Sequence, residues 1–438
     1  MAHVNIPDEI PVKYLSRPRW WNMLAGAMVI IGFASFVMAL SGNSTRAWQA
    51  YMVNWLFFTK IAMGAVAFTA VTYVVRAKWN WSVRRLSLSP VSFLPVSFVL
   101  FLPALFALRE NYFPWIEEME HDPILQAKEA WLNVPALVTR NFIGVAVLFG
   151  LALLFARRAL RPDMGLVEGH EEGHAGRAKW RARLTGGWKG QEVEEVDSHQ
   201  SMARIAPALL LAYGVVMSML SFDWIMSLEP HWYSTLFGGF FFMGAFWAGI
   251  ALTTRLSVFL KLRDDDMDRM IGPSQLHDLG KLAFAFTVFW GYLFFSQYLP
   301  IWYGKLPWEQ AYLIARAEPP WGKLSALWIT LCFVVPFVAL IGRTPKMKPL
   351  WIGFFTGVIL IGLWLELYVL IAPVHYDGGS IFPGWELLVA LMFMGLLMLS
   401  IGWFLSTFPV VQMWQPMSDP EVLDAEHVHR PSEPVSGD

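Results

Sequence analysis

Long apolar runs are the feature that most constrains what this chain can fold into. Each run has about twenty residues or more, enough for a helix to cross the roughly 30 Å hydrocarbon core of a membrane. There are ten, near residues 22–40, 48–75, 91–108, 132–156, 203–222, 232–260, 279–300, 324–342, 350–373 and 385–407. Of the 438 residues, 56% are hydrophobic and 15% are charged, whereas about a quarter of a soluble domain is charged. We predict an all-α, polytopic integral membrane protein with ten transmembrane helices.

The distribution of positive charge predicts the orientation. If the N-terminus is cytoplasmic, the cytoplasmic segments hold 23 of the 33 Lys and Arg residues, and the opposite side holds seven. Lys and Arg favour the cytoplasmic face of a membrane, so we predict that both termini are cytoplasmic. Residues 1–413 then form one transmembrane domain, and residues 414–438 form a polar, acidic tail that we expect to be disordered.

Two segments outside the predicted spans have some length. Residues 109–130 are acidic and face the exterior, where they form either a solvated loop or a docking surface for an external partner. Residues 161–202 mix both charges with Gly and His. The spacing of their histidines is too loose for a metal site without help from Cys, so we expect a solvated cytoplasmic linker.

Two ionisable residues fall deep inside predicted spans, where a charge is costly and marks a functional candidate. Lys60 lies about twelve residues into the second run, hence about 18 Å from its outer end, and Asn54 and Thr59 accompany it. Glu366 lies far from either end of the ninth run. A lone carboxylate there is either protonated or paired. Both residues are candidates for proton handling, and Lys60 is the partner to suspect for Glu366. The bland alternative for Lys60 is a snorkelling side chain.

Polar residues also gather at the outer ends of the spans. Asp223, Glu229 and His231 lie in or beside the short connection between the fifth and sixth runs. They either cap a helix or form a proton entry or exit, because His and carboxylates exchange protons near neutral pH. Arg140 follows Pro135 in the outer half of the fourth run. It either satisfies backbone carbonyls freed by the proline or binds an anionic ligand.

A second cluster opens the seventh run at the cytoplasmic side. His277 and Asp278 precede Lys281 by four and three residues, which places all three on one helical surface. The cluster is either a cap with an ion pair or a cytoplasmic proton port.

Cysteine and histidine usage limits the cofactors that this chain can hold. The single cysteine, Cys332, excludes an internal disulfide, a Cys-only iron–sulfur site and a C-x-x-C-H haem attachment. A membrane haem b needs two axial His, and none of the ten His lies mid-span. His231 and His375 are near the outer surface, and we do not expect them to share a haem. P-loop, Rossmann and zinc-hydrolase motifs are absent, so the sequence shows no constellation for chemistry of its own.

Three stretches carry a resemblance to a known family. They are KEAWLNVPALVTR at 128–140, SFDWIMSLEPHWYSTLFG at 221–238 and HDLGKLAFAFTVFWGYLFFSQYLPIWYGKLP at 277–307. Together they resemble the ActF-type membrane subunits of bacterial alternative complex III, a quinol:electron acceptor oxidoreductase, which are related to NrfD- and PsrC-type subunits. The similarity covers most of the fourth to seventh runs.

The resemblance implies a fold, a location and a set of partners. The fold is two four-helix bundles flanked by two outer helices, in the bacterial cytoplasmic membrane. The partners are an ActC-type paralogue that binds quinol, an iron–sulfur subunit, c-type cytochrome subunits and small membrane subunits. Iron–sulfur clusters and c-type haems belong to those partners, quinol is the substrate of the complex, and this chain carries no redox cofactor. For this subunit the resemblance implies proton conduction, assembly or both.

Three functional hypotheses remain open at this stage. In the first, the chain is a cofactor-free subunit of the complex with proton half-channels. Its candidate residues are Lys60, Asp223, Glu229, His231, His277, Asp278, Lys281 and Glu366. In the second, the chain itself binds quinol in the outer half of a bundle, at Arg140, Asp223 and His231. In the third and least expected, it is a stand-alone secondary transporter, which predicts inverted repeats and broken helices; no repeat is evident.

Overall fold

The computed structural model describes residues 6–7, 10–107, 112–170 and 175–417. Among these residues there is no strand, and ten helical segments are long and apolar enough to cross a membrane. The predicted all-α polytopic class is therefore confirmed. The spanning segments are α1 (Arg19–Gly42), α2 (Ser44–Val74), α3 (Arg84–Leu88) continuing through η1 (Ser89–Phe93) into α4 (Leu94–Ala107), α8 (Val134–Leu166), α10 (Gln191–Trp224), α11 (Leu236–Lys261), α13 (Pro273–Gly304), α15 (Gly322–Ile329) continuing through η3 (Thr330–Val334) into α16 (Val335–Leu340), α18 (Pro349–Ile371) and α19 (Gly384–Thr407).

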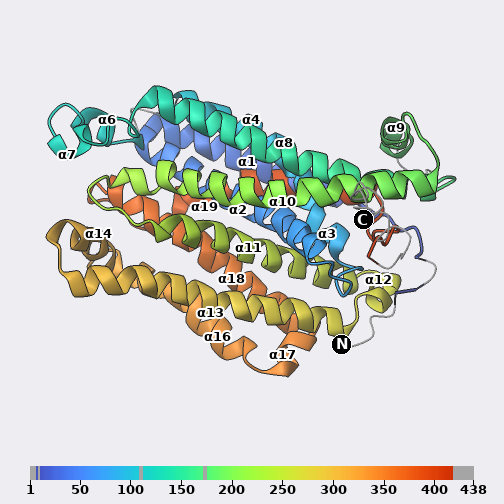
Figure 1. The fold of residues 1–438 in the computed structure, drawn as a ribbon. Coiled ribbons are helices and arrows are strands. Elements are labelled where there is room, and N and C mark those ends of the chain that lie inside the picture. Colours follow the sequence, from blue (N-terminus) through green and yellow to red (C-terminus); the bar gives the residue numbers. More distant parts are fainter. Residues whose placement is uncertain (1–5, 8–9, 108–111, 171–174, 418–438) are drawn as a thin grey trace, which may run out of the picture.

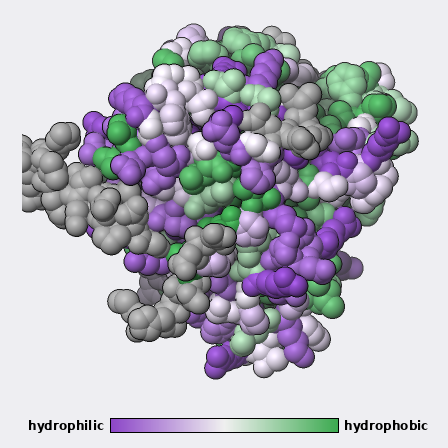
Figure 2. Space-filling model, turned by 90° about the vertical axis from the view of Figure 1, so that its right-hand side faces the viewer, coloured by the Kyte–Doolittle hydropathy of each residue, from purple (hydrophilic) through white to green (hydrophobic). Residues whose placement is uncertain are grey.

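Short helices lie at the two ends of the bundle. One end carries α6 (Trp115–Glu118), α7 (Pro123–Gln126) and α14 (Pro307–Ala317); it is at the left of Figure 1. The other carries α9 (Ala175–Leu184), α12 (Asp265–Met270) and α17 (Arg343–Met347). This second end holds the segments predicted to be cytoplasmic, and Figure 2 shows that mostly hydrophilic residues cover it, with smaller hydrophobic areas between them. We call it the inner end, and the opposite one the outer end.

The spans form two groups of four around α2. One group contains α2, α4, α8 and α10; the other contains α11, α13, α15–α16 and α18. Helix α2 joins the groups by packing against α11, and almost all of its residues are buried. Helices α1 and α19 pack on each other and flank the bundles beside α2. Figure 1 shows α4 and α8 on one side of the molecule and α13 and α16 on the other. The predicted arrangement of two four-helix bundles with two flanking helices is confirmed.

Local sequence signals set the helix ends. The side chain of Asn43 accepts a hydrogen bond from Arg46 N and caps α2, and Asn133 caps α8 through Ala136 N. Proline stands in the first turn of α13, α14 and α18, where its missing N–H costs no hydrogen bond. The two asparagine caps provide acceptors for backbone N–H groups, which lipid cannot do.

Glycines allow the helices to approach closely. A Cβ on Gly64 of α2 would lie 1.7 Å from Ala245 O of α11, and one on Gly249 would lie 2.1 Å from Ala65 N. The flanking pair is similar, because a Cβ on Gly32 of α1 would lie 2.3 Å from Met392 N of α19. Without a hydrophobic driving force in lipid, such backbone contacts are a main source of helix association.

The structure corrects the expected linker at residues 161–202. Helix α8 continues to Leu166, α10 begins at Gln191, and α9 lies between them. Arg161 pairs with Glu194 at 2.5 Å, and both side chains are buried. Much of the segment is therefore packed helix rather than solvated linker. Residues 171–174 and most of the predicted tail, 418–438, lie outside the described residues.

Candidate functional site

An ion pair lies in the middle of the membrane-spanning bundle, between the two helix groups. Lys60 Nζ of α2 is 2.6 Å from Glu366 Oε1 of α18, and the two side chains are 0% and 1% exposed. The pairing that the sequence suggested but could not establish is therefore present. A Cβ on Gly244 of α11 would lie 3.0 Å from Lys60 Nζ, so that glycine leaves room for the ammonium group.

This pair has few other partners. The second oxygen of Glu366 accepts a hydrogen bond from Trp290 Nε1 of α13 at 2.7 Å. Lys60 Nζ also lies 5.0 Å from the centre of the Phe241 ring. An ammonium group has three donors, and within the described residues Lys60 uses one of them on a protein acceptor. Both partners can change protonation, so the pair can exist ionised or, after proton transfer, neutral.

Polar groups continue from this pair toward the outer end. Asn54 lies six residues before Lys60 on α2, about 9 Å along the helix axis. Its Nδ2 donates to Glu386 O at 2.8 Å, and its Oδ1 accepts from Trp364 Nε1 at 2.9 Å. The buried carboxylate of Glu386 is 3.2 Å from Arg46 Nε, and its Oε2 has no partner among the described residues. Because the Arg46 side chain is 27% exposed, the row reaches the outer surface.

Sequence reasoning missed Glu386, although one signal was available. This glutamate stands in the first turn of an apolar run that contains no other charge. The packing of α19 on α2 buries it completely.

Toward the inner end the polar groups are hydroxyls. Thr253, Thr254 and Ser257 of α11 and Thr356 of α18 are all fully buried. Each hydroxyl donates to a carbonyl four residues earlier in its own helix. Such back-bonds satisfy the hydroxyl locally, so these hydroxyls form no chain of hydrogen bonds from helix to helix within the described part of the molecule.

The cluster at the start of α13 stands at the inner surface. Lys281 Nζ is 2.6 Å from Asp278 Oδ1, and these side chains are 55% and 28% exposed. His277 is partly buried beside them. The ion pair of the bland interpretation is therefore present, and a role as a proton port stays a prediction.

Asp223 belongs to a second, very different buried pair. It lies in the last turn of α10 rather than in the connecting loop. Arg140 reaches it with Nε and Nη2, each at 2.7 Å, Asn141 Nδ2 donates at 2.5 Å and Trp131 Nε1 at 3.0 Å. The Arg140 guanidinium also lies 4.2 Å from the Trp131 ring centre. Four donors thus occupy the two carboxylate oxygens, and the two motifs at 128–140 and 221–238 meet here.

The neighbouring loop residues contact other partners. Glu229 Oε1 lies 2.8 Å from Arg316 Nη1 of α14, and His231 Nε2 lies 2.6 Å from Asp122 Oδ2 at the start of α7. A backbone hydrogen bond from Ile124, together with His231, lowers the pKa of Asp122 below its ordinary value. The three outer candidates that the sequence grouped are therefore held by three separate partners. Arg316 was counted only as a loop charge, yet it is buried.

The inner end contains further buried pairs that sequence reasoning treated as loop charges. Arg85 of α3 pairs with Asp163 of α8, and both side chains are fully enclosed. Asp163 also accepts a hydrogen bond from Trp414 N at 2.8 Å. These contacts fix the segment after α19 against the first helix group, so we assign them to the architecture.

Comparison with known proteins adds no family: no family model matches the chain, and no curated protein matches it.

Proposed function

We propose that this chain is a cofactor-free membrane subunit of a respiratory quinol:electron acceptor oxidoreductase, of the alternative complex III type, in which the Lys60–Glu366 pair handles protons. The observation that carries the proposal is this buried, sparsely coordinated Lys–Glu pair at mid-membrane. The identity of the complex rests on the resemblance of the three motifs, and the location in the bacterial cytoplasmic membrane rests on it too.

The proposed mechanism uses the ability of both partners to gain or lose a proton. When Glu366 is protonated, its attraction for the Lys60 ammonium is lost and the flexible four-carbon stem of Lys60 is free to turn. The row formed by Asn54, Glu386 and Arg46 then provides the outer half-channel. The hydroxyls between Lys60 and His277 provide the inner half, with water completing the connections. Redox change in partner subunits would supply the energy for this movement.

The second hypothesis, quinol bound at Arg140, Asp223 and His231, is less well supported. The carboxylate of Asp223 already accepts four hydrogen bonds, which leaves it no free position for a quinol hydroxyl. His231 contacts Asp122 instead. Binding of quinol by the ActC-type partner, with this subunit moving protons, agrees better with these contacts.

The test of the complex is co-purification. The chain is extracted from its native membrane in mild detergent, and mass spectrometry and a visible spectrum are recorded on the same sample. We expect iron–sulfur and c-type cytochrome subunits, an ActC-type paralogue and small membrane subunits to accompany it. A colourless chain that purifies without partners would contradict the proposal and favour a transporter.

The test of proton handling is Glu366→Gln in the reconstituted complex. The amide keeps the shape of the side chain but cannot carry a proton, so we expect assembly and quinol oxidation to persist while protons moved per electron fall. Glu192→Gln, the same change at an exposed position of α10, is the matched control and leaves the ratio unchanged. A Glu366→Gln complex that moves protons at the wild-type ratio would rule out this role.

A further inference from the structure

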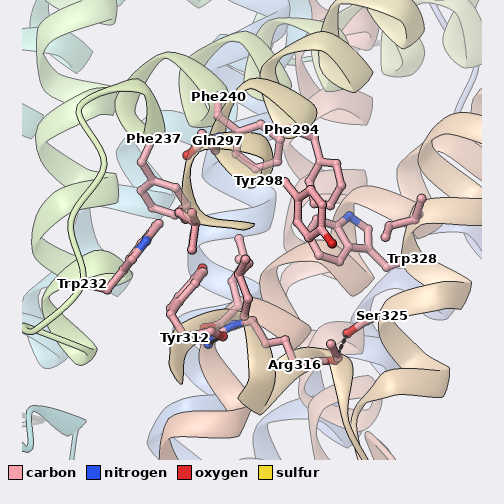
Figure 3. A pocket seen from close by; sticks show the side chains of 15 residues that line it. Trp232, Phe237, Phe240, Phe294, Gln297, Tyr298, Tyr312, Arg316, Ser325 and Trp328 are labelled. Carbon is pink, nitrogen blue, oxygen red and sulfur yellow. Dashed lines mark hydrogen bonds between the residues drawn. The ribbon is translucent and has the colours of Figure 1, made fainter. Parts of the chain in front are cut away.

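An aromatic cavity of about 150 Å³ lies in the outer half of the second helix group, among α11, α13, α14 and α15. Figure 3 shows its labelled side chains arranged around an open centre. Seven of the fifteen lining residues are aromatic: Trp232, Phe237, Phe240, Phe294, Tyr298, Tyr312 and Trp328. Its other lining residues include Gln297 and Arg316. None of these residues belonged to the sites predicted from the sequence.

The cavity has exposed lining residues on α13 and α14. On its α13 side, the rings of Trp290 and Phe294 contact Trp328 of α15, so these two spans meet beside the cavity. The π-helical turn Thr330–Val334 follows the lining residue Ile329 directly. Tyr298 of α13 and Ala317 at the end of α14 line the cavity and are exposed. Because these spans face lipid, a ligand would enter from the membrane.

Three buried donors in the wall lack acceptors. The Nε1 atoms of Trp232 and Trp328 and the Nε of Arg316 have no hydrogen-bond partner among the described residues, although these residues are only 3%, 4% and 5% exposed. Buried donors are normally paired, so a missing partner is informative. Two of the three are held firmly: the Trp232 ring stacks on Tyr312 with 3.8 Å between centroids, and Arg316 Nη2 donates to Leu370 O at 2.7 Å.

The volume of the cavity and the charge of its wall limit the class of ligand that can bind. A cavity of about 150 Å³ holds one six-membered ring, as the benzene-binding cavity of an engineered lysozyme does. Arg316 is neutralised by Glu229 at 2.8 Å, so the site offers no net positive charge to an anionic head group. Flat aromatic walls favour a planar ring over a flexible acyl chain.

We infer that this cavity binds a neutral, lipid-soluble single ring with carbonyl or hydroxyl oxygens, the class of the benzoquinones, with its tail leaving past the exposed residues Tyr298 and Ala317. The ring oxygens accept hydrogen bonds from Trp232 and Arg316. The wall also touches the mid-membrane pair, because Trp290, which donates to Glu366, stacks on Phe294 at 5.5 Å. The binding inference does not depend on proton movement, and its test measures binding alone.

The experiment uses the full-length chain in lipid nanodiscs and a photoactivatable benzoquinone with a ten-carbon tail. Labelled peptides are mapped by mass spectrometry. We expect saturable labelling within residues 298–329, which unlabelled benzoquinone prevents and stearic acid does not. Labelling that does not saturate, or that stearic acid prevents equally well, would overturn the inference and show an acyl-chain groove.

Two variants and one control sharpen this experiment. Ala317→Trp fills the mouth and should lower labelling at least tenfold. Ala326→Trp adds the same side chain at an exposed position of α15 outside the lining and should leave labelling intact. Trp232→Phe keeps a ring on Tyr312 but removes the donor, and should weaken binding about fivefold, as expected for one hydrogen bond. Unchanged labelling in Ala317→Trp would overturn the site.

Discussion

Two buried ion pairs in this molecule have similar N–O distances, 2.6 and 2.7 Å, but differ in their other hydrogen-bond partners. Arg140–Asp223, near the outer end, is closed: its carboxylate receives four hydrogen bonds and its guanidinium stacks on Trp131. Lys60–Glu366, at mid-membrane, is open: Glu366 receives one hydrogen bond from Lys60 and one from Trp290.

The chemistry of the cations deepens the contrast. Arg stays protonated in proteins, whereas Lys can lose its proton when buried. If Asp223 were removed, Arg140 could not become neutral, and its charge would remain in a partly buried position. If either member of the mid-membrane pair were removed, the other could neutralise itself. A carboxylate with all its hydrogen bonds made, paired with Arg, holds helices together. A carboxylate with few hydrogen bonds, paired with Lys, can change its protonation.

The largest effect is expected for Asp223→Ala. Removing one partner of a buried pair costs about 3–5 kcal/mol, and here Asn141 and Trp131 lose an acceptor as well. We expect a marked drop in the thermal unfolding midpoint of the detergent-solubilised chain, followed by circular dichroism. A variant as stable as the wild type would show that the two pairs do not differ in the way described.

Lys60→Met should destabilise the chain less. Glu366 is then left to take up a proton and keep its bond from Trp290, so the cost is that of a poorly satisfied buried group, about 1–3 kcal/mol. The double variant Lys60→Met/Glu366→Leu should recover most of the loss, because replacing both partners of a buried pair by apolar groups is often neutral. The same unfolding assay measures both. A larger loss of unfolding stability in Lys60→Met than in Asp223→Ala would contradict the proposed difference between the two pairs.

Asp122, which is partly exposed, pairs with His231 and provides a counterpart to both buried pairs. The pKa of its carboxyl is lowered in the folded chain by the backbone of Ile124 and by His231. Stabilisation from this group is therefore complete above the unfolded value of 3.8 and is lost as pH falls through the folded value. We expect amide hydrogen exchange in residues 115–128, corrected for intrinsic rates, to lose protection in that range. Asp122→Asn should show weaker protection at neutral pH without this acid transition.

The smallest effect is expected for Asp278→Ala at the inner surface. Its pair with Lys281 is partly exposed at the surface, and surface pairs three residues apart on a helix contribute about 0.5 kcal/mol or less. Unfolding should be nearly unchanged. The same variant in the reconstituted complex sharpens the functional question, since a fall in protons moved per electron without loss of stability would identify the cluster as the inner port.

The sequence predicted the spans and both members of the mid-membrane pair because hydropathy and a lone charge in an apolar run are local signals. The pairing itself joins residues 306 positions apart, and nothing local encodes it. Trp290 is one of 23 tryptophans, and no local sequence pattern distinguishes it as the hydrogen-bond donor to Glu366. Charges at helix ends were misjudged for the same reason: Arg85 and Arg161 count as loop charges until their carboxylate partners on other helices are known.

The close packing of α1 on α19 has a consequence for biosynthesis. Helix α1 enters the membrane first, but its face around Gly32 meets α19 only after the last span has been made. The buried Glu386 that bonds Arg46 arrives with the same helix, 340 residues later. A nascent chain therefore keeps α1 and the outer face of α2 open to lipid until translation is nearly finished. Chains that stop before α19 would leave both of these faces exposed to lipid.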